Sequence, residues 1–104
     1  MTAVVVVATT RPLPEHRAEV ITAMEKAIAD AHARDDGCLL YALREGDDRL
    51  VMVEKWASAD ALAGHSRGAA LAELNQALSG RLEGGLDVQI LRSHPAGTPA
   101  QGTL

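Results

Sequence analysis

Apolar residues follow two different spacings along this chain, and each spacing predicts one kind of element. Residues 3–9 form a β-branched run that stops at a proline-containing segment, which is typical of a strand. Apolar runs at residues 38–44 and 49–56 lie on either side of the polar segment 45–48, so they predict a hairpin. A fourth strand is expected at residues 86–91.

Two other segments carry apolar residues at three- and four-residue spacing, the pattern of an amphipathic helix. The first covers residues 15–34, and Gly37 can adopt the positive φ that follows its end. The second is divided in two. Ser58 can cap a short helix that ends near Gly64, and a further helix is expected over residues 69–78.

The resulting order is β-α-β-β-α-β, which is the ferredoxin-like arrangement of an α+β domain with an antiparallel sheet. Residues 1–92 are expected to form this single domain. Residues 93–104 are rich in Pro and Gly and have no apolar periodicity, so they are expected to form a flexible C-terminal tail.

The strands are apolar on both faces. A sheet that is covered by helices on one face normally alternates apolar and polar residues, yet residues 4–7 are all valine. Two helices of this length can cover only one face of the sheet, so we expect a homodimer in which the outer sheet faces pack together. Such burial contributes roughly 25 cal/mol per Å² before the costs of association. The alternative is a monomer in which the tail covers the outer face.

Composition narrows the possible partners and compartment. The chain of 104 residues has a net charge of −4 with no long run of either sign, so neither a nucleic-acid nor a membrane partner is expected. The first twelve residues have no basic segment, and their apolar run is too short for a signal peptide or a membrane span. The single Cys38 cannot form an internal disulfide, and a cytoplasmic protein is expected.

The common catalytic and metal-binding motifs are missing from the sequence. The four histidines, at positions 16, 32, 65 and 94, lack zinc-type spacing with one another or with Cys38. There is also no GxGxxG, Walker A or GxSxG motif. No metal site and no nucleotide cofactor are therefore expected.

The third predicted strand carries the most informative polar residue. Alternation places Met52, Glu54 and Trp56 on one face of this strand, and the aliphatic residues between them on the other. If the aliphatic face forms the dimer contact, Glu54 points toward the helices. A buried carboxylate needs a partner or an aqueous cavity, so these residues indicate a pocket between sheet and helices. The alternative is that Glu54 pairs with a surface arginine and Trp56 only fills the core.

His65 lies nine residues beyond Trp56, at the predicted break between the two helical pieces. An imidazole there could point into the same pocket and hold or transfer a proton near neutral pH. The alternative is a histidine at a helix end that is hydrogen-bonded to backbone.

Several short motifs together resemble the antibiotic biosynthesis monooxygenase family and the small quinol monooxygenases within it, over about residues 3–91. They are Val5-Val6-Val7-Ala8, Gly37-Cys38-Leu39 with Tyr41, and Val53-Glu54-Lys55-Trp56 followed by Ala61-Leu62 and His65. The resemblance implies a ferredoxin-like fold whose sheets pair into a dimeric α/β-barrel. For enzymatic members it also implies oxygenation of a small phenolic or quinol-type substrate by O2 without metal or flavin, so that no cofactor is needed.

On this reading the site has two catalytic residues and four substrate contacts. Trp56 would stack on or bound the ligand, and His65 would handle a proton. Contacts to a small apolar or aromatic substrate would come from Met52, Glu54, Tyr41 and Leu71. Alternation on the second strand leaves open whether Tyr41 faces the pocket or the dimer side.

The chain also departs from the family at particular positions. Quinone-forming members have an asparagine four residues before the tryptophan, where this chain has Met52. Members that degrade haem have an axial histidine in the last helix, and residues 73–76 contain none, so haem degradation is disfavoured. A non-catalytic dimeric module of the same fold, binding a ligand or acting in stress, is therefore the alternative to a monooxygenase.

Overall fold

The computed structural model describes residues 2–104, and its central element is one antiparallel sheet. The strands are β1 (Val4–Thr10), β2 (Cys38–Glu45), β3 (Leu50–Trp56) and β4 (Asp87–Arg92). They lie in the order β2-β3-β1-β4. Strands β3 and β1 are therefore in the middle of the sheet, and β2 and β4 are at its edges. This is the predicted α+β ferredoxin-like arrangement.

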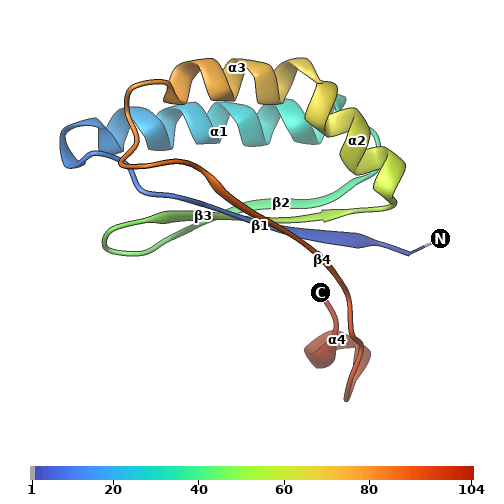
Figure 1. Cartoon of the computed structure of the whole chain (residues 1–104). Helices are drawn as coiled ribbons and strands as arrows, with labels where there is room; N and C mark the ends of the chain where they lie inside the picture. The colour runs from blue at the N-terminus through green and yellow to red at the C-terminus, as the bar shows by residue number, and fades with distance from the viewer. Residues whose placement is uncertain (1) are drawn as a thin grey trace.

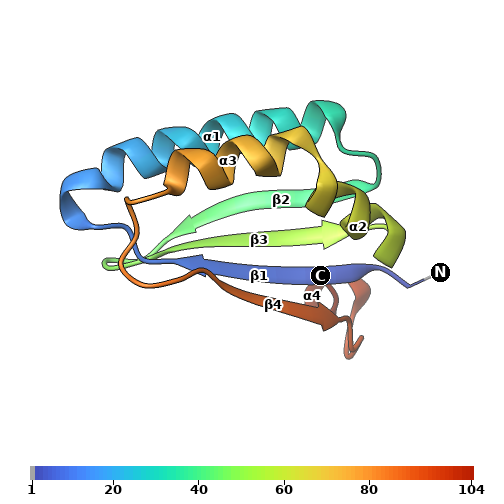
Figure 2. The same ribbon diagram turned by 45° about the horizontal axis from the view of Figure 1, so that its top comes forward.

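The main helices lie on one face of the sheet (Figure 1, Figure 2). They are α1 (Arg17–Arg34), α2 (Ala59–Arg67) and α3 (Ala69–Leu78), and a single 3₁₀ turn, η1 (Pro14–His16), precedes α1. Ser58 caps α2 as predicted, because its hydroxyl oxygen accepts a hydrogen bond of 3.1 Å from the Ala61 amide.

Two predicted boundaries differ from the structure. Helix α2 continues through Gly64 to Arg67, and the extended backbone of Gly68 separates it from α3. One glycine inside a helix costs only about 1 kcal/mol, so Gly64 need not end it. The tail contains one helical turn, α4 (Pro99–Gly102), which its composition did not predict. Thr98 caps this turn through a hydrogen bond from the Gln101 amide.

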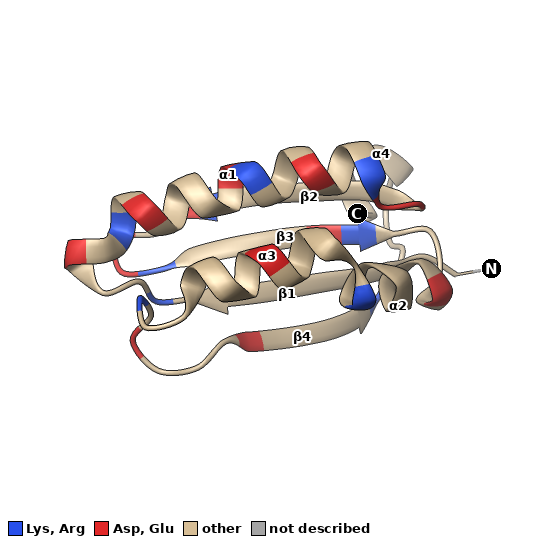
Figure 3. Cartoon of the chain, turned by 90° about the horizontal axis from the view of Figure 1, so that it is seen from above, with Lys and Arg blue, Asp and Glu red and all other residues tan. Residues whose placement is uncertain are grey.

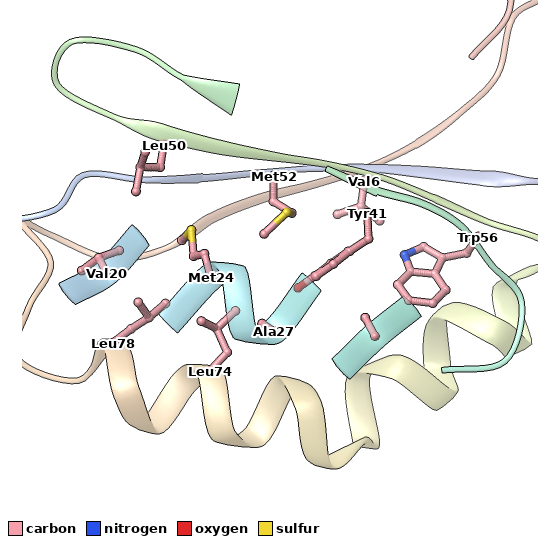
Figure 4. Packing of buried hydrophobic residues seen from close by; sticks show 11 residues of the cluster. Val6, Val20, Met24, Ala27, Tyr41, Leu50, Met52, Trp56, Leu74 and Leu78 are labelled. Carbon is pink, nitrogen blue, oxygen red and sulfur yellow. The ribbon is translucent and has the colours of Figure 1, made fainter. Parts of the chain in front are cut away.

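The core lies between the sheet and the helices. Helix α1 contributes a buried stripe at helical spacing, and β3 contributes every second residue, so each element buries the face that its periodicity predicted. Figure 4 shows these side chains meeting between the two layers. The largest fully buried side chains of the core are Trp56, Leu50 and Val20.

The opposite face of the sheet, called the outer face below, carries no helix from α1, α2 or α3 (Figure 1). The tail with α4 lies on this side of the sheet (Figure 1), where its residues 94–101 are themselves exposed, and Val5 of the outer face is 8% exposed. On the helix side, charged residues of both signs alternate along α1 (Figure 3). The apolar residues of the outer face are Val5, Val7, Leu40, Ala42, Val51, Val53 and Leu91, and its polar residues are Thr9, Arg44, Lys55, Asp87 and Gln89.

None of the helices in residues 2–104 is both long and apolar enough to cross a bilayer.

Candidate functional site

A cavity of about 140 Å³ lies between the sheet and helices α2 and α3. Its walls are mainly aliphatic and thioether side chains, including those of Met52 on β3 and Leu71 on α3. Polar atoms are few, so a bound molecule would contact mostly apolar surface and be oriented by a small number of groups. The polar side chains in the wall are Thr10, Tyr41, Glu54, His65, Ser66 and Asn75.

The cavity is least covered along β4. Val88 and Ile90 point to the helix side of the sheet and contribute to the wall, yet they are 49% and 65% exposed. The view from above shows that α3 does not extend over β4 (Figure 3). A small ligand would therefore enter across β4.

Glu54 is one of three ionisable side chains that are buried in the wall, the others being His65 and Tyr41. Alternation along β3 turns it toward the helices, where it is 5% exposed. Its Oε1 accepts a hydrogen bond of 2.9 Å from the indole nitrogen of Trp56. Burial raises the pKa of the Glu54 carboxyl, and the indole donor and nearby His65 oppose that rise. The partner of this carboxyl is thus an indole inside the protein rather than a surface arginine.

His65 is the second group, and it occupies the last turn of α2 with 5% of its surface exposed. Its Nδ1 lies 2.6 Å from Oδ2 of Asp35, so its partner is a carboxylate and not the backbone. The ring stacks on the indole of Trp56 with centroids 4.4 Å apart, and it meets Tyr41 edge-on at 5.2 Å. These contacts fix the imidazole on three sides.

Trp56 lies deeper than the sequence led us to expect. It has no exposed surface and does not belong to the cavity wall, so a ligand in the cavity cannot stack on it. The indole instead lies behind Glu54 and His65, hydrogen-bonded to the first and stacked on the second.

Tyr41 faces the cavity rather than the outer face. It pairs in register with Glu54, and its side chain extends toward α1 (Figure 4). Burial and the nearby carboxylates of Glu54 and Asp35 raise the pKa of the Tyr41 phenol, so this group stays neutral and available as a hydrogen-bond donor.

The structure thus brings Met52, Glu54, Tyr41, Leu71 and His65 to one cavity. Nothing in the sequence indicated that Asp35, just after the first predicted helix, belongs to the site. No local pattern links Asp35 to a histidine thirty residues later. The sequence did not indicate Ser66 and Asn75 either, because there they look like polar residues on the exposed side of a helix. Among residues 2–104, no three His, Cys, Asp or Glu side chains are grouped so that they could hold a metal ion.

Comparisons with known proteins place this geometry in a family. The sequence profile described as antibiotic biosynthesis monooxygenase matches residues 3–77. A proposed antibiotic biosynthesis monooxygenase from Caulobacter crescentus CB15 has 25% identity and a TM-score of 0.84, over 89% of this chain and 91% of that chain. A conserved protein from Methanosarcina mazei Go1 has 26% identity and a TM-score of 0.78, over 88% and 93%.

The fold alone is shared with Rv0793 from Mycobacterium tuberculosis, at 24% identity and a TM-score of 0.83 over 94% of this chain and 99% of that chain. The comparison with curated protein sequences gives no match. Since the profile covers most of the domain and the same fold is present, the chain belongs to the antibiotic biosynthesis monooxygenase family.

Proposed function

We propose that this protein is a cofactor-independent monooxygenase that oxidises a small phenolic or quinol-type aromatic compound with O2. The observation that carries the proposal is the presence of His65 and Glu54 together in the wall of one apolar cavity. Family membership and the name of the Caulobacter relative support the same reaction class. In this role Met52 and Leu71 pack against the aromatic ring, and the polar groups orient its hydroxyl.

His65 acts as the base that removes the proton of the substrate hydroxyl. The resulting phenolate is electron-rich enough to give one electron to O2, and the two radicals combine to form a carbon–oxygen bond at the ring. The ring peroxide then breaks its O–O bond and loses water, so one oxygen atom remains in the quinone product and the other leaves as water. Both electrons for this cleavage come from the substrate.

Glu54, Tyr41 and Trp56 support that step in different ways. Oε1 of Glu54 is occupied by the indole of Trp56, which leaves Oε2 for a ligand hydroxyl. The neutral phenol of Tyr41 can donate a hydrogen bond to the substrate oxygen as negative charge develops on it. Trp56 holds both Glu54 and His65 in place from behind rather than touching the ligand.

The test is oxygen consumption with a panel of hydroxynaphthalenes, naphthoquinols and anthrones, with ¹⁸O2 used to follow the incorporated atom. We expect one labelled oxygen atom per quinone and a rate that falls by about 10²- to 10⁴-fold in His65→Gln. His16→Gln is the matched control, since His16 lies outside the cavity and pairs with Glu19. Tight ligand binding without oxygen uptake by any of these compounds would instead identify a ligand-binding module.

The active protein in this proposal is a homodimer joined through the outer faces of two sheets. The aliphatic side chains of that face support it, because helices α1, α2 and α3 all lie on the other face of the sheet.

A further inference from the structure

Asp35 is at an unusual place for a carboxylate. It caps the C-terminal end of α1, where its amide donates a hydrogen bond of 3.0 Å to the carbonyl of Ala31. The C-terminal end of a helix carries partial negative charge, so a carboxylate there costs helix stability, typically about 0.3–1 kcal/mol. The helix therefore gives no reason for an acid at this position, and the reason has to come from the contact that its side chain makes.

Asp35 pairs with only one of the basic side chains of residues 2–104, that of His65. The side chains are 11% and 4% exposed, and the 2.6 Å separation is that of a strong, charge-assisted hydrogen bond. Arg34, the residue before Asp35 in the sequence, is paired with Asp30 at 3.3 Å instead. An ionised carboxylate only accepts hydrogen bonds, so the proton between the two groups belongs to Nδ1 of the imidazole. When the ring is neutral, Nε2 is then its unprotonated nitrogen.

His65 also separates two environments. One side of the ring belongs to the cavity, together with Tyr41 and Glu54. Its other side belongs to a surface hollow that contains Asp35, Asp36, Asp60 and Arg34. The hollow also lies beside the C-terminal end of α2, and Asp35 is the carboxylate in it that pairs with the ring.

We propose that Asp35 is the positioning residue of this site. It holds His65 in the tautomer that carries its proton on Nδ1, so that Nε2 is the base available to the cavity, and it stabilises the positive ring that forms when Nε2 takes a proton. The inference rests on the proposed function for the identity of the proton donor, which is the ligand hydroxyl. The assignment of the tautomer stands without any ligand.

The experiment combines ¹⁵N NMR of the histidine side chains with the oxygen-uptake assay, on the full chain and three variants. Asp35→Asn removes the charge at nearly constant shape, and its amide can donate to Nδ1 and so favour the other tautomer. Asp35→Glu keeps the carboxylate. Asp36→Asn is the matched control. Asp36 is exposed in the same hollow, but His65 pairs with Asp35.

In the unmodified protein, neutral His65 should show the Nδ1-protonated pattern. Asp35→Asn should shift the ring toward the Nε2-protonated pattern and lower kcat by about 10²-fold or more with a smaller change in KM. Asp36→Asn should leave the tautomer unchanged and kcat within about twofold. Asp35→Glu should restore the wild-type tautomer pattern.

An Nε2-protonated His65 in the unmodified protein overturns the inference, as does an Asp35→Asn variant with an unchanged tautomer and rate. Failure of the proposed function looks different. The unmodified protein then consumes no oxygen with any phenol or quinol of the panel, while the Nδ1-protonated pattern and its dependence on Asp35 remain.

Discussion

The indole nitrogen of Trp56 donates a hydrogen bond of 2.9 Å to Oε1 of Glu54, two residues earlier on β3. Both side chains point to the helix side because residues two apart share a face of a strand. The same indole stacks on His65 from α2. One fully buried ring thus connects Glu54 with His65, and its loss should affect both.

We expect Trp56→Phe to destabilise the protein by about 2–4 kcal/mol, because it leaves a buried carboxyl without its donor and removes ring volume from the core. Denaturant unfolding measures the change. The same substitution in a Glu54→Leu background removes no bond to a carboxyl, so the cost there should be smaller by about 1 kcal/mol or more. Equal costs in the two backgrounds would show that the hydrogen bond contributes nothing.

Glu54 should make stability fall as pH rises through the weakly acidic range. Its folded-state pKa is raised above the ordinary value of 4.5, mainly by burial. Its contribution is therefore fully present below about pH 4.5 and is lost as the pH rises through the raised pKa. In Glu54→Gln this dependence disappears, while the amide oxygen can still accept from the indole. The free energy of unfolding of the wild type minus that of the variant should decrease between pH 4 and pH 8, and a constant difference contradicts the shift.

The fold was predictable from the sequence because local patterns determine it. Alternation placed Met52, Glu54 and Trp56 on the helix side, and a capping serine marked the start of α2. The site was only partly predictable. Whether Trp56 forms the cavity wall or lies behind it depends on how α2 packs on the sheet, and no spacing records that packing.

Asp35 shows the same limit more clearly. Its partner lies thirty residues away in the sequence and is reached only because the end of α1 and the end of α2 meet in space. The exposed edge at Val88 and Ile90 is also a property of the assembled layers, since the pattern of β4 resembles that of the covered strands.

The outer face should join two copies of this chain. Val53 lies at its centre, between Val7 on β1 and Ala42 on β2. We expect light scattering at micromolar concentration to give a dimer mass for the unmodified chain. Val53→Asp should give a monomer mass, because the carboxylate would be buried without a partner in the dimer. Ala29→Glu, at an exposed position of α1, should leave the mass unchanged. A monomer mass for the unmodified chain contradicts the proposed dimer.

Gly37 lies close to α2, and Gly80, which has a nearly equal φ but no such neighbour, is the control for this contact. Gly37 has φ +77°, and a Cβ added there would lie 2.6 Å from the Cβ of Ala61 on α2. Gly80 has φ +76° with no atom within 4 Å of an added Cβ. Gly80→Ala should therefore cost only the left-handed conformation, about 1–2 kcal/mol. Gly37→Ala should cost about 1–3 kcal/mol more, because α2 must also move away.

That movement has a second consequence, because Gly37 lies two residues after Asp35 and faces the helix that carries His65. If α2 is displaced, the 2.6 Å contact between Asp35 and His65 should lengthen. The histidine NMR signal of His65 should then change in Gly37→Ala but not in Gly80→Ala. Thermal unfolding measures the first effect, and the ¹⁵N spectrum of the folded protein measures the second. Equal destabilisation by the two substitutions, with an unchanged His65 signal, would show that the close approach of Gly37 to α2 does not hold this pair together.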